Sequence, residues 1–295
     1  MLDQPFLPSE KILVNVAGGD IALFRYGGIG ATPVLLIHGV TSSNRAFQLF
    51  AKALINRGFT PYAVDLRGRG DSNHLPPPYG MKAHANDMKA VIDEISGVPI
   101  DVIGHSMGAF VAVALQGIYP NSVAKLTLID GGIPLALPPG FTVEQVMQLI
   151  LGPALARLAM KFESREAYRK YWMPHPAFNK GWTPAMNEYV DYDLRGTAPN
   201  MYASTTPKAV AEDSEDLFVS DLIENTLTSL NKEVLFLMAG RGLLNEAGGL
   251  YPQATLDLVL PKYPKLKEIL IPDTNHYDIL LESKGAEACA VAIYG

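Results

Sequence analysis

The sequence is poor in cysteine and has no surplus of basic residues. Cys289 is the one cysteine among 295 residues, so no disulfide can form within this sequence. This excludes the disulfide-stapled scaffolds of small secreted domains and fits a reducing compartment. The 24 Lys and Arg residues stand against 30 Asp and Glu residues, a formal net charge of −6. Because Lys and Arg also form no run, we expect neither a nucleic acid nor an anionic membrane as a partner.

Long hydrophobic runs are absent as well. No stretch reaches the roughly 18 uninterrupted apolar residues of a membrane span, and segment 1–5 lacks the basic and apolar regions of a signal peptide. The composition is nevertheless 48% hydrophobic and 18% charged, which is enough apolar surface for a large buried core. We therefore expect a globular, cytoplasmic protein.

Short apolar runs rich in β-branched residues open the sequence, and they predict strands at 11–16, 20–25 and 33–37. The glycine pairs between them, Gly18-Gly19 and Gly27-Gly28, predict hairpin turns. From residue 46 the apolar spacing becomes helical.

Predicted helices then alternate with predicted strands, as helices 46–56, 82–95 and 107–119 and strands 60–66, 100–103 and 123–129. Alternation at this spacing is typical of βαβ crossovers. It predicts an α/β fold with a doubly wound, mostly parallel central sheet that helices cover on both faces.

The alternation stops for about a hundred residues after Asp130. Segment 133–230 is helix-like in pieces, is broken by prolines, and holds both tryptophans and five of the ten methionines. Strand and helix resume at 233–239, 256–263, 268–271 and 284–293. We therefore predict one α/β core made of 1–132 and 231–295, with 133–230 inserted as a helical lid.

One motif with chemical content lies between a predicted strand and a predicted helix. Gly104-His105-Ser106-Met107-Gly108 has the form G-x-S-x-G. A sharp strand-to-helix turn at the serine brings neighbouring backbone so close that larger side chains at the two glycines would clash. This context is the one that a nucleophile elbow needs, so Ser106 is the candidate nucleophile.

Together with three further segments in the same order, this motif resembles the α/β-hydrolase fold superfamily over nearly the whole chain. It is similar to a serine esterase or lipase with a helical cap. The matching segments are His38-Gly39-Val40 after the third strand, 65–72 after the fourth, and Asn275-His276-Tyr277 after the last. The resemblance implies the α/β-hydrolase fold and a serine, histidine and acid triad that requires no cofactor.

A serine hydroxyl needs a base within hydrogen-bond reach, most often an imidazole. Of the six histidines, His276 follows a C-terminal strand, at the end where open α/β sheets place ligands, and we expect it to be the base. No pair of histidines has metal-ligand spacing, so no metal site is expected.

The acid of the triad departs from the common pattern of the superfamily, which places it about three residues after the glycine that ends the strand following the lid. Here that position is Leu243. Asp130, which follows the strand at 123–129, and Glu246, in the loop at 240–249, remain as candidates. Asp130 is favoured and Glu246 is the alternative.

The remaining expected site features are an oxyanion hole and an apolar pocket. The backbone N–H groups of Val40 and Met107 are the expected oxyanion donors. Part of the aromatic content of the lid, including Trp172 and Trp182, is expected to line an apolar pocket over Ser106.

These features favour a serine hydrolase that cleaves a carboxylic ester, or a related acyl bond, of a small and largely apolar substrate through an acyl-enzyme. A carbon–carbon bond hydrolase of ring-cleavage products would use the same triad. A ligand-binding receptor or scaffold on the same fold is the alternative from another class. The sequence carries no signal for the oligomeric state.

Overall fold

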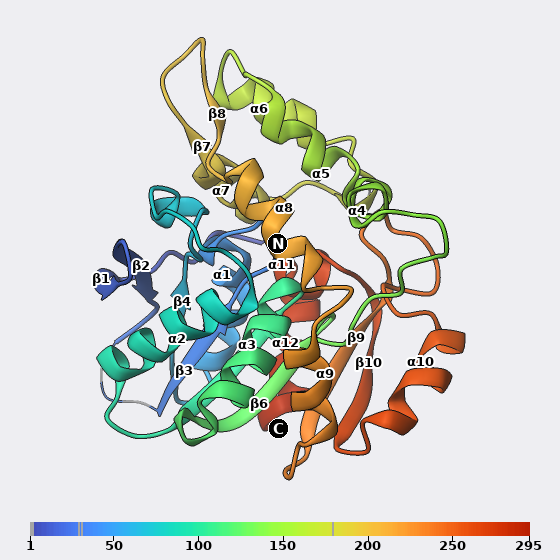
Figure 1. Ribbon diagram of the computed structural model, residues 1–295. Helices are drawn as coiled ribbons and strands as arrows, with labels where there is room; N and C mark the ends of the chain where they lie inside the picture. Colours follow the sequence, from blue (N-terminus) through green and yellow to red (C-terminus); the bar gives the residue numbers. More distant parts are fainter. Residues whose placement is uncertain (1–2, 29, 31, 179) are drawn as a thin grey trace.

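The computed structural model describes residues 3–28, 30, 32–178 and 180–295, so Met1 and Leu2 of the N-terminal segment lie outside the described residues. In this part of the chain a central eight-stranded sheet has the order β1-β2-β4-β3-β5-β6-β9-β10 (Figure 1). Its strands are β1 (Glu10–Val16), β2 (Gly19–Arg25), β3 (Thr32–Ile37), β4 (Phe59–Val64), β5 (Ile100–His105), β6 (Val123–Ile129), β9 (Val234–Arg241) and β10 (Leu266–Asn275).

Most neighbouring strands are parallel. The pairs from β4 through β3, β5, β6 and β9 to β10 run parallel, whereas β1–β2 and β2–β4 are antiparallel. The predicted doubly wound, mostly parallel sheet is confirmed.

One of the two predicted hairpins is wrong. The turn at Gly18-Gly19 joins β1 and β2, with Val16 opposite Gly19. The strand that follows Gly27-Gly28, β3, does not pair with β2. In the sheet, β4 lies between these two strands. The physical reason is burial: β3 ends in four consecutive buried residues, a continuous apolar run that suits a strand with parallel neighbours on both sides.

Helices cover both faces of the sheet, because successive strand residues point to opposite faces. Leu35 and Ile37 belong to the apolar cluster that contains α2 (Met81–Ile95), α3 (Met107–Ile118) and α9 (Asp221–Thr228). Val34 and Leu36 belong to the cluster on the other face, with α1 (Gln48–Ile55) and α12 (Ser283–Tyr294), where Cys289 is buried.

Short helices and two short strands fill much of segment 133–230. They are α4 (Val143–Leu151), α5 (Pro153–Ala156), α6 (Arg165–Trp172), α7 (Pro184–Asp193), β7 (Leu194–Arg195), β8 (Tyr202–Ala203) and α8 (Pro207–Glu215). In Figure 1 α4 to α7 lie together at the top of the view, beyond one end of the sheet. The next helix, α9, packs against α3 on the face of the sheet. The division into a core and a lid at residues 133 and 230 stays a prediction.

Three of these helices begin at side-chain caps. The hydroxyls of Thr142, Ser164 and Thr183 each accept the N–H group three residues further on, which satisfies a donor that the first helical turn leaves unpaired. Local sequence thus decides where these helices start.

The remaining helical segments are short or lie near the C-terminus. They are α10 (Gln253–Val259), α11 (Asp278–Leu281) and the 3₁₀ turns Asn44–Phe47, Gly70–Ser72, Pro120–Ser122, Arg157–Ala159, Pro176–Phe178 and Leu260–Lys262. Among the described residues, we find no helix whose length and apolar character would let it cross a lipid bilayer.

Candidate active site

Ser106 occupies the sharp turn between β5 and α3. Its backbone has φ 56° and ψ −126°, a left-handed conformation that is uncommon outside glycine. The turn is held by the N–H of Ser106, which donates to the carbonyl of Ile129 at 2.9 Å, and by the N–H of Ala109, which donates to the carbonyl of Ser106 at 3.0 Å.

The two glycines of the motif are sterically required. A Cβ added at Gly104 would lie 2.2 Å from the carbonyl oxygen of Gly108, and one added at Gly108 would lie 1.9 Å from the carbonyl oxygen of Ile37. The elbow therefore packs backbone against backbone, as the sequence motif predicts.

His276 follows β10 and its imidazole is paired with Asp130. Nδ1 of His276 lies 2.6 Å from Oδ2 of Asp130, and both side chains are buried. The other carboxylate oxygen of Asp130 accepts the N–H of Ala239 at 3.2 Å. With Nδ1 protonated toward Asp130, Nε2 of His276 keeps its lone pair and can accept a proton.

Of the two candidate acids, the structure brings only Asp130 to the imidazole. The carboxylate of Glu246 turns back into its own loop, where it accepts the N–H of Leu244 at 2.8 Å. Leu243, which stands where the common pattern has the acid, is buried instead.

Ser106 and His276 line one partly open cavity of about 400 Å³, a volume that includes the solvent at its mouth. The wall is largely apolar, and it includes residues of the loop after β3, of the helices α4 and α7, of the loop after β9, and of α11. Its other lining residues are Gly39, Val40, Thr41, Ser42, Ala46, His105, Leu151, Tyr189, Leu243, Tyr277, Leu280 and Leu281. The lining residues Leu151, Tyr189 and Leu243 were not singled out as pocket residues by the sequence, which offers no local signal for them.

The loop after β3, which carries Gly39 and Val40, is fixed by a neutral histidine. Nε2 of His38 accepts the N–H of Leu66 at 3.0 Å, so the proton sits on Nδ1, which donates to the carbonyl of Gly39 at 2.7 Å. Burial lowers the pKa of His38 to about 3. The ring therefore stays uncharged at neutral pH.

This contact also orients the N–H of Val40. The peptide bond between Gly39 and Val40 is trans, so its N–H points opposite to the carbonyl that His38 holds. Among the hydrogen bonds recorded for residues 3–28, 30, 32–178 and 180–295, none uses the N–H of Val40 or of Met107. Val40 lines the cavity of Ser106, whereas Met107 is buried at the start of α3 and is not among the lining residues.

His105, inside the elbow motif, supports the histidine of the pair. Its Nε2 donates to the carbonyl of His276 at 3.0 Å, and the two rings pack with their centroids 4.7 Å apart. Burial, together with the neighbouring His276, holds the pKa of His105 well below its ordinary value. The uncharged ring of His105 thus supports the backbone of the loop that carries His276.

The two tryptophans lie elsewhere in segment 133–230. Trp172 packs among Phe178, His175 and Tyr277 and lines a smaller neighbouring cavity. Trp182 packs on Phe178 and donates its indole N–H to Asn187 at 2.7 Å. Neither is among the residues that line the cavity of Ser106, because both large rings pack against other aromatic side chains instead.

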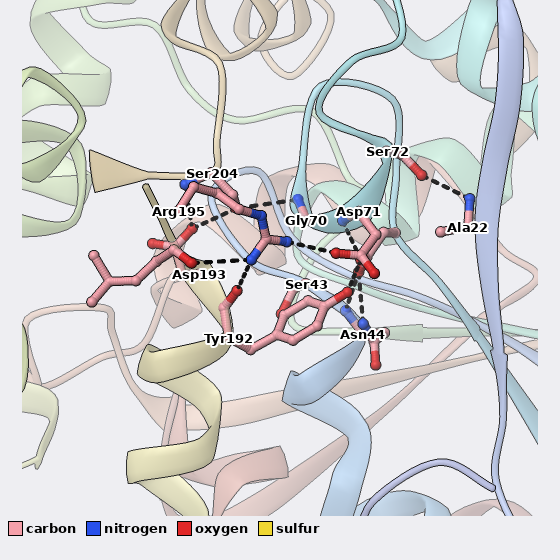
Figure 2. A network of polar contacts seen from close by, with 12 residues as sticks. Ala22, Ser43, Asn44, Gly70, Asp71, Ser72, Tyr192, Asp193, Arg195 and Ser204 are labelled. Carbon is pink, nitrogen blue, oxygen red and sulfur yellow. Dashed lines mark hydrogen bonds and ion pairs between the residues drawn. The ribbon is translucent and has the colours of Figure 1, made fainter. Parts of the chain in front are cut away.

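A partly buried polar network joins α7 and β7 to loops beside the site (Figure 2). The carboxylate of Asp65 accepts the N–H of Asn44 at 2.8 Å and the hydroxyl of Tyr192 at 2.6 Å. Nearby, Arg195 pairs with Asp71 at 2.8 Å. Residues of α7 and β7 are therefore anchored to the loops after β3 and β4.

Metal-ligating side chains do not gather in the described part of the chain. No group of three or more His, Cys, Asp and Glu side chains there has the arrangement to hold a metal ion.

Comparison with known proteins gives one family and several relatives. A family model described as "Alpha/beta hydrolase family" matches residues 34–290. The chain is 34% identical over 132 residues to the Lipase LipV of Mycobacterium tuberculosis (strain ATCC 25618 / H37Rv), a match that covers 45% of this chain and 48% of that protein. It is 32% identical over 127 residues to the sn-1-specific diacylglycerol lipase ABHD11 of Mus musculus, covering 43% and 38%. Each match thus spans less than half of the relative's length.

Solved structures resemble the chain over almost its full length. One is described as an E-2-(acetamidomethylene)succinate hydrolase, with a TM-score of 0.75, 19% identity and coverage of 97% of this chain and 98% of that chain. Another is a thioesterase domain from the curacin biosynthetic pathway, with a TM-score of 0.73, 19% identity and coverage of 96% and 99%. At this identity the likeness shows the fold.

Proposed function

Because the chain belongs to the alpha/beta hydrolase family, we propose that it is a serine hydrolase that cleaves a carboxylic ester, or a related acyl bond, of a small and largely apolar substrate. The observation that carries the proposal is the 2.6 Å pairing of His276 with Asp130 at a cavity that His276 shares with Ser106. The names of two relatives, a lipase and a diacylglycerol lipase, also support ester cleavage.

In the first half-reaction Oγ of Ser106 attacks the ester carbonyl while Nε2 of His276 takes the hydroxyl proton. Asp130 keeps the imidazole in the required tautomer and stabilises the imidazolium that forms. His276 then gives the proton to the leaving alcohol, and the acyl group stays on Ser106.

The negative charge on the carbonyl oxygen is held by the N–H groups of Val40 and Met107. The absence of a protein acceptor for either group in the described residues supports this role. The N-terminus of α3, where Met107 lies, adds a favourable dipole. Losing one such donor typically costs about 100-fold to 1,000-fold in rate.

In the second half-reaction a water molecule attacks the acyl-enzyme. His276 takes a proton from the water and returns it to Oγ of Ser106, and the carboxylic acid leaves. The largely apolar lining of the cavity supports a small acyl group with few polar atoms.

A fluorophosphonate probe tests the nucleophile. We expect stoichiometric labelling of the wild-type protein and of Ser229→Ala, an exposed serine at the end of α9, and no labelling of Ser106→Ala. Folded wild-type protein that stays unlabelled at Ser106 would count against the enzyme and favour a ligand-binding scaffold.

A substrate panel separates ester from carbon–carbon cleavage. We expect turnover of p-nitrophenyl esters of short acyl chains, measured by p-nitrophenolate release. Turnover of a ring-cleavage diketone, with no release from any ester, would replace this proposal by a carbon–carbon bond hydrolase with the same residues.

A further inference from the structure

A fully buried arginine contacts the loop after β3, which carries the proposed oxyanion donor Val40. The side chain of Arg69 has no exposed surface. Its Nε donates to the carbonyl of Val40 at 3.0 Å, and its Nη1 donates to the carbonyl of Arg67 at 2.9 Å and pairs with Asp213 at 2.5 Å. One guanidinium thus joins the loop after β3, the turn after β4 and the helix α8.

The contact with Val40 bears on the direction of an oxyanion donor. His38 holds the carbonyl of the peptide before the Cα atom of Val40, and Arg69 holds the carbonyl of the peptide after it. Because hydrogen bonds fix the peptide planes on both sides of the Cα atom of Val40, the direction of its N–H group is fixed as well. Nη2 of Arg69 also lies 3.9 Å from the sulfur of Met107, the residue that carries the other proposed donor.

The guanidinium of Arg69 also forms an ion pair with a residue of segment 133–230. Asp213, on α8, has no exposed side-chain surface, and its second oxygen accepts the N–H of Gly80 at 2.5 Å and lies 3.0 Å from Nε2 of His84. Although burial alone would raise it, the neighbouring His84 and Arg69 hold the pKa of Asp213 far below its ordinary value. The ion pair therefore persists across the working pH range.

We propose that Arg69 is a positioning residue of the oxyanion hole and that, through Asp213, it ties this hole to helix α8. The inference rests on the proposed function, because it concerns the same site. Since an oxyanion hole acts on the transition state more than on the bound substrate, disturbing Arg69 lowers kcat and leaves KM nearly unchanged.

Arg67 supplies a matched control. It lies two positions earlier, is also nearly fully buried, and its guanidinium pairs with Asp87 at 2.8 Å and donates to the carbonyls of Pro76 and Ala17. None of these partners lines the cavity of Ser106. Replacing either arginine by lysine keeps a buried positive charge but loses the planar fork of donors.

The first experiment measures kcat and KM for p-nitrophenyl acetate, and the affinity for a trifluoromethyl ketone that forms a tetrahedral oxyanion on the serine. For Arg69→Lys we expect kcat and the affinity to fall together, by about 10-fold to 100-fold, with KM within about threefold. For Arg67→Lys we expect kcat within twofold, although urea unfolding shows a similar loss of stability. Equal values of kcat and inhibitor affinity in the two variants would overturn the proposal.

The second experiment does not depend on activity. In protein labelled with ¹⁵N-valine, the amide resonance of Val40 is assigned by its loss in Val40→Ile. We expect this resonance to shift in Arg69→Lys and to stay in place in Arg67→Lys. An unchanged Val40 resonance in Arg69→Lys would overturn the role of Arg69, even in a protein that the fluorophosphonate probe labels. Conversely, the Val40 resonance can shift in Arg69→Lys while the wild-type protein has no esterase activity. That result would support the contact by which Arg69 positions Val40, but it would contradict the proposed serine hydrolase.

Asp213→Asn tests the link to α8 and replaces Arg69→Lys if that variant does not fold. It keeps Arg69 and weakens its ion pair with α8, and it also changes the contacts of Asp213 with Gly80 and His84. We expect the Val40 resonance to shift and kcat to fall, whereas Asp87→Asn, the equivalent change at the partner of Arg67, should do neither. Equal kcat values and equal Val40 resonances in the two variants would refute the proposed link between α8 and Val40.

Discussion

Asp130 and His276 meet across the strand β9, which lies between their own strands in the sheet. Asp130 follows β6 and His276 follows β10, and β9 separates the two. The carboxylate accepts the N–H of Ala239 on β9 with one oxygen and meets Nδ1 of His276 with the other. The strand in between therefore holds the carboxylate in the orientation that the imidazole needs.

Asp130→Asn should lower kcat by about 10,000-fold, because an amide can stabilise the wrong imidazole tautomer and carries no charge to stabilise the imidazolium. Ester hydrolysis under saturating substrate measures the effect. Glu246→Gln is the control and should keep a near-normal kcat, since that carboxylate bonds to Leu244 in its own loop. The reverse ranking of the two variants would make Glu246 the acid.

His105→Phe should lower kcat by about 10-fold to 100-fold, because it keeps a ring against His276 but removes the donor that holds the backbone carbonyl of His276. His105→Gln can offer an N–H at a similar distance from the backbone and should recover most of the rate. Steady-state kinetics of both variants check this. If the two variants are equally impaired, the hydrogen bond is not what supports His276.

Leu243→Ala should shift the preferred acyl chain toward longer esters, because Leu243 lines the cavity of Ser106 and its truncation adds room. Discrimination by a hydrophobic pocket is worth about 10-fold or more per methylene, so we expect the ratio of kcat/KM for hexanoyl over acetyl ester to rise by about 10-fold. Leu270→Ala, on the exposed side of β10, should leave the ratio unchanged. A constant ratio in Leu243→Ala would exclude this side chain from the acyl site.

Gly108→Ala should destabilise the protein strongly, because its Cβ would lie 1.9 Å from the carbonyl oxygen of Ile37. Overpacking of this kind costs about 1–3 kcal/mol or more, which urea unfolding measures. At Gly97 an added Cβ meets nothing within 4 Å, so Gly97→Ala should unfold near the wild-type midpoint. Similar midpoints for the two variants would show that the elbow tolerates a side chain.

The free energy of unfolding should fall as the pH drops from about 6.5 toward 4. Burial, with Arg157 nearby, lowers the pKa of His175 to about 4, so in this window the unfolded chain binds a proton that the folded chain does not. Each such histidine contributes at most about 1.4 kcal/mol per pH unit.

His175→Asn tests this dependence. The asparagine oxygen can accept the N–H of Ala177 as Nδ1 of His175 does, while the titrating group is gone. Urea unfolding at pH 7.5 and 4.5 should show a smaller difference in the variant than in the wild type, and His38 and His105 contribute to the difference that is left. An equal difference would mean that His175 does not contribute.

The sequence determined the family, the fold class and the local form of the elbow. Strand and helix periodicity predicted the parallel sheet, and the two glycines around Ser106 predicted a backbone turn that tolerates no larger residue. These features follow from sterics and hydrogen bonding between residues close in sequence, so a short stretch of chain contains the information.

Only the tertiary structure decided which carboxylate meets His276, where the tryptophans pack, and which of two nearly adjacent arginines contacts Val40. Asp130 and His276 are 146 residues apart, and Arg69, in the turn after β4, meets Asp213 on α8. Such pairs depend on the order of strands in the sheet and on how the helices of segment 133–230 pack against the rest of the chain. Those arrangements are set by packing of the whole chain, so no local pattern can encode them.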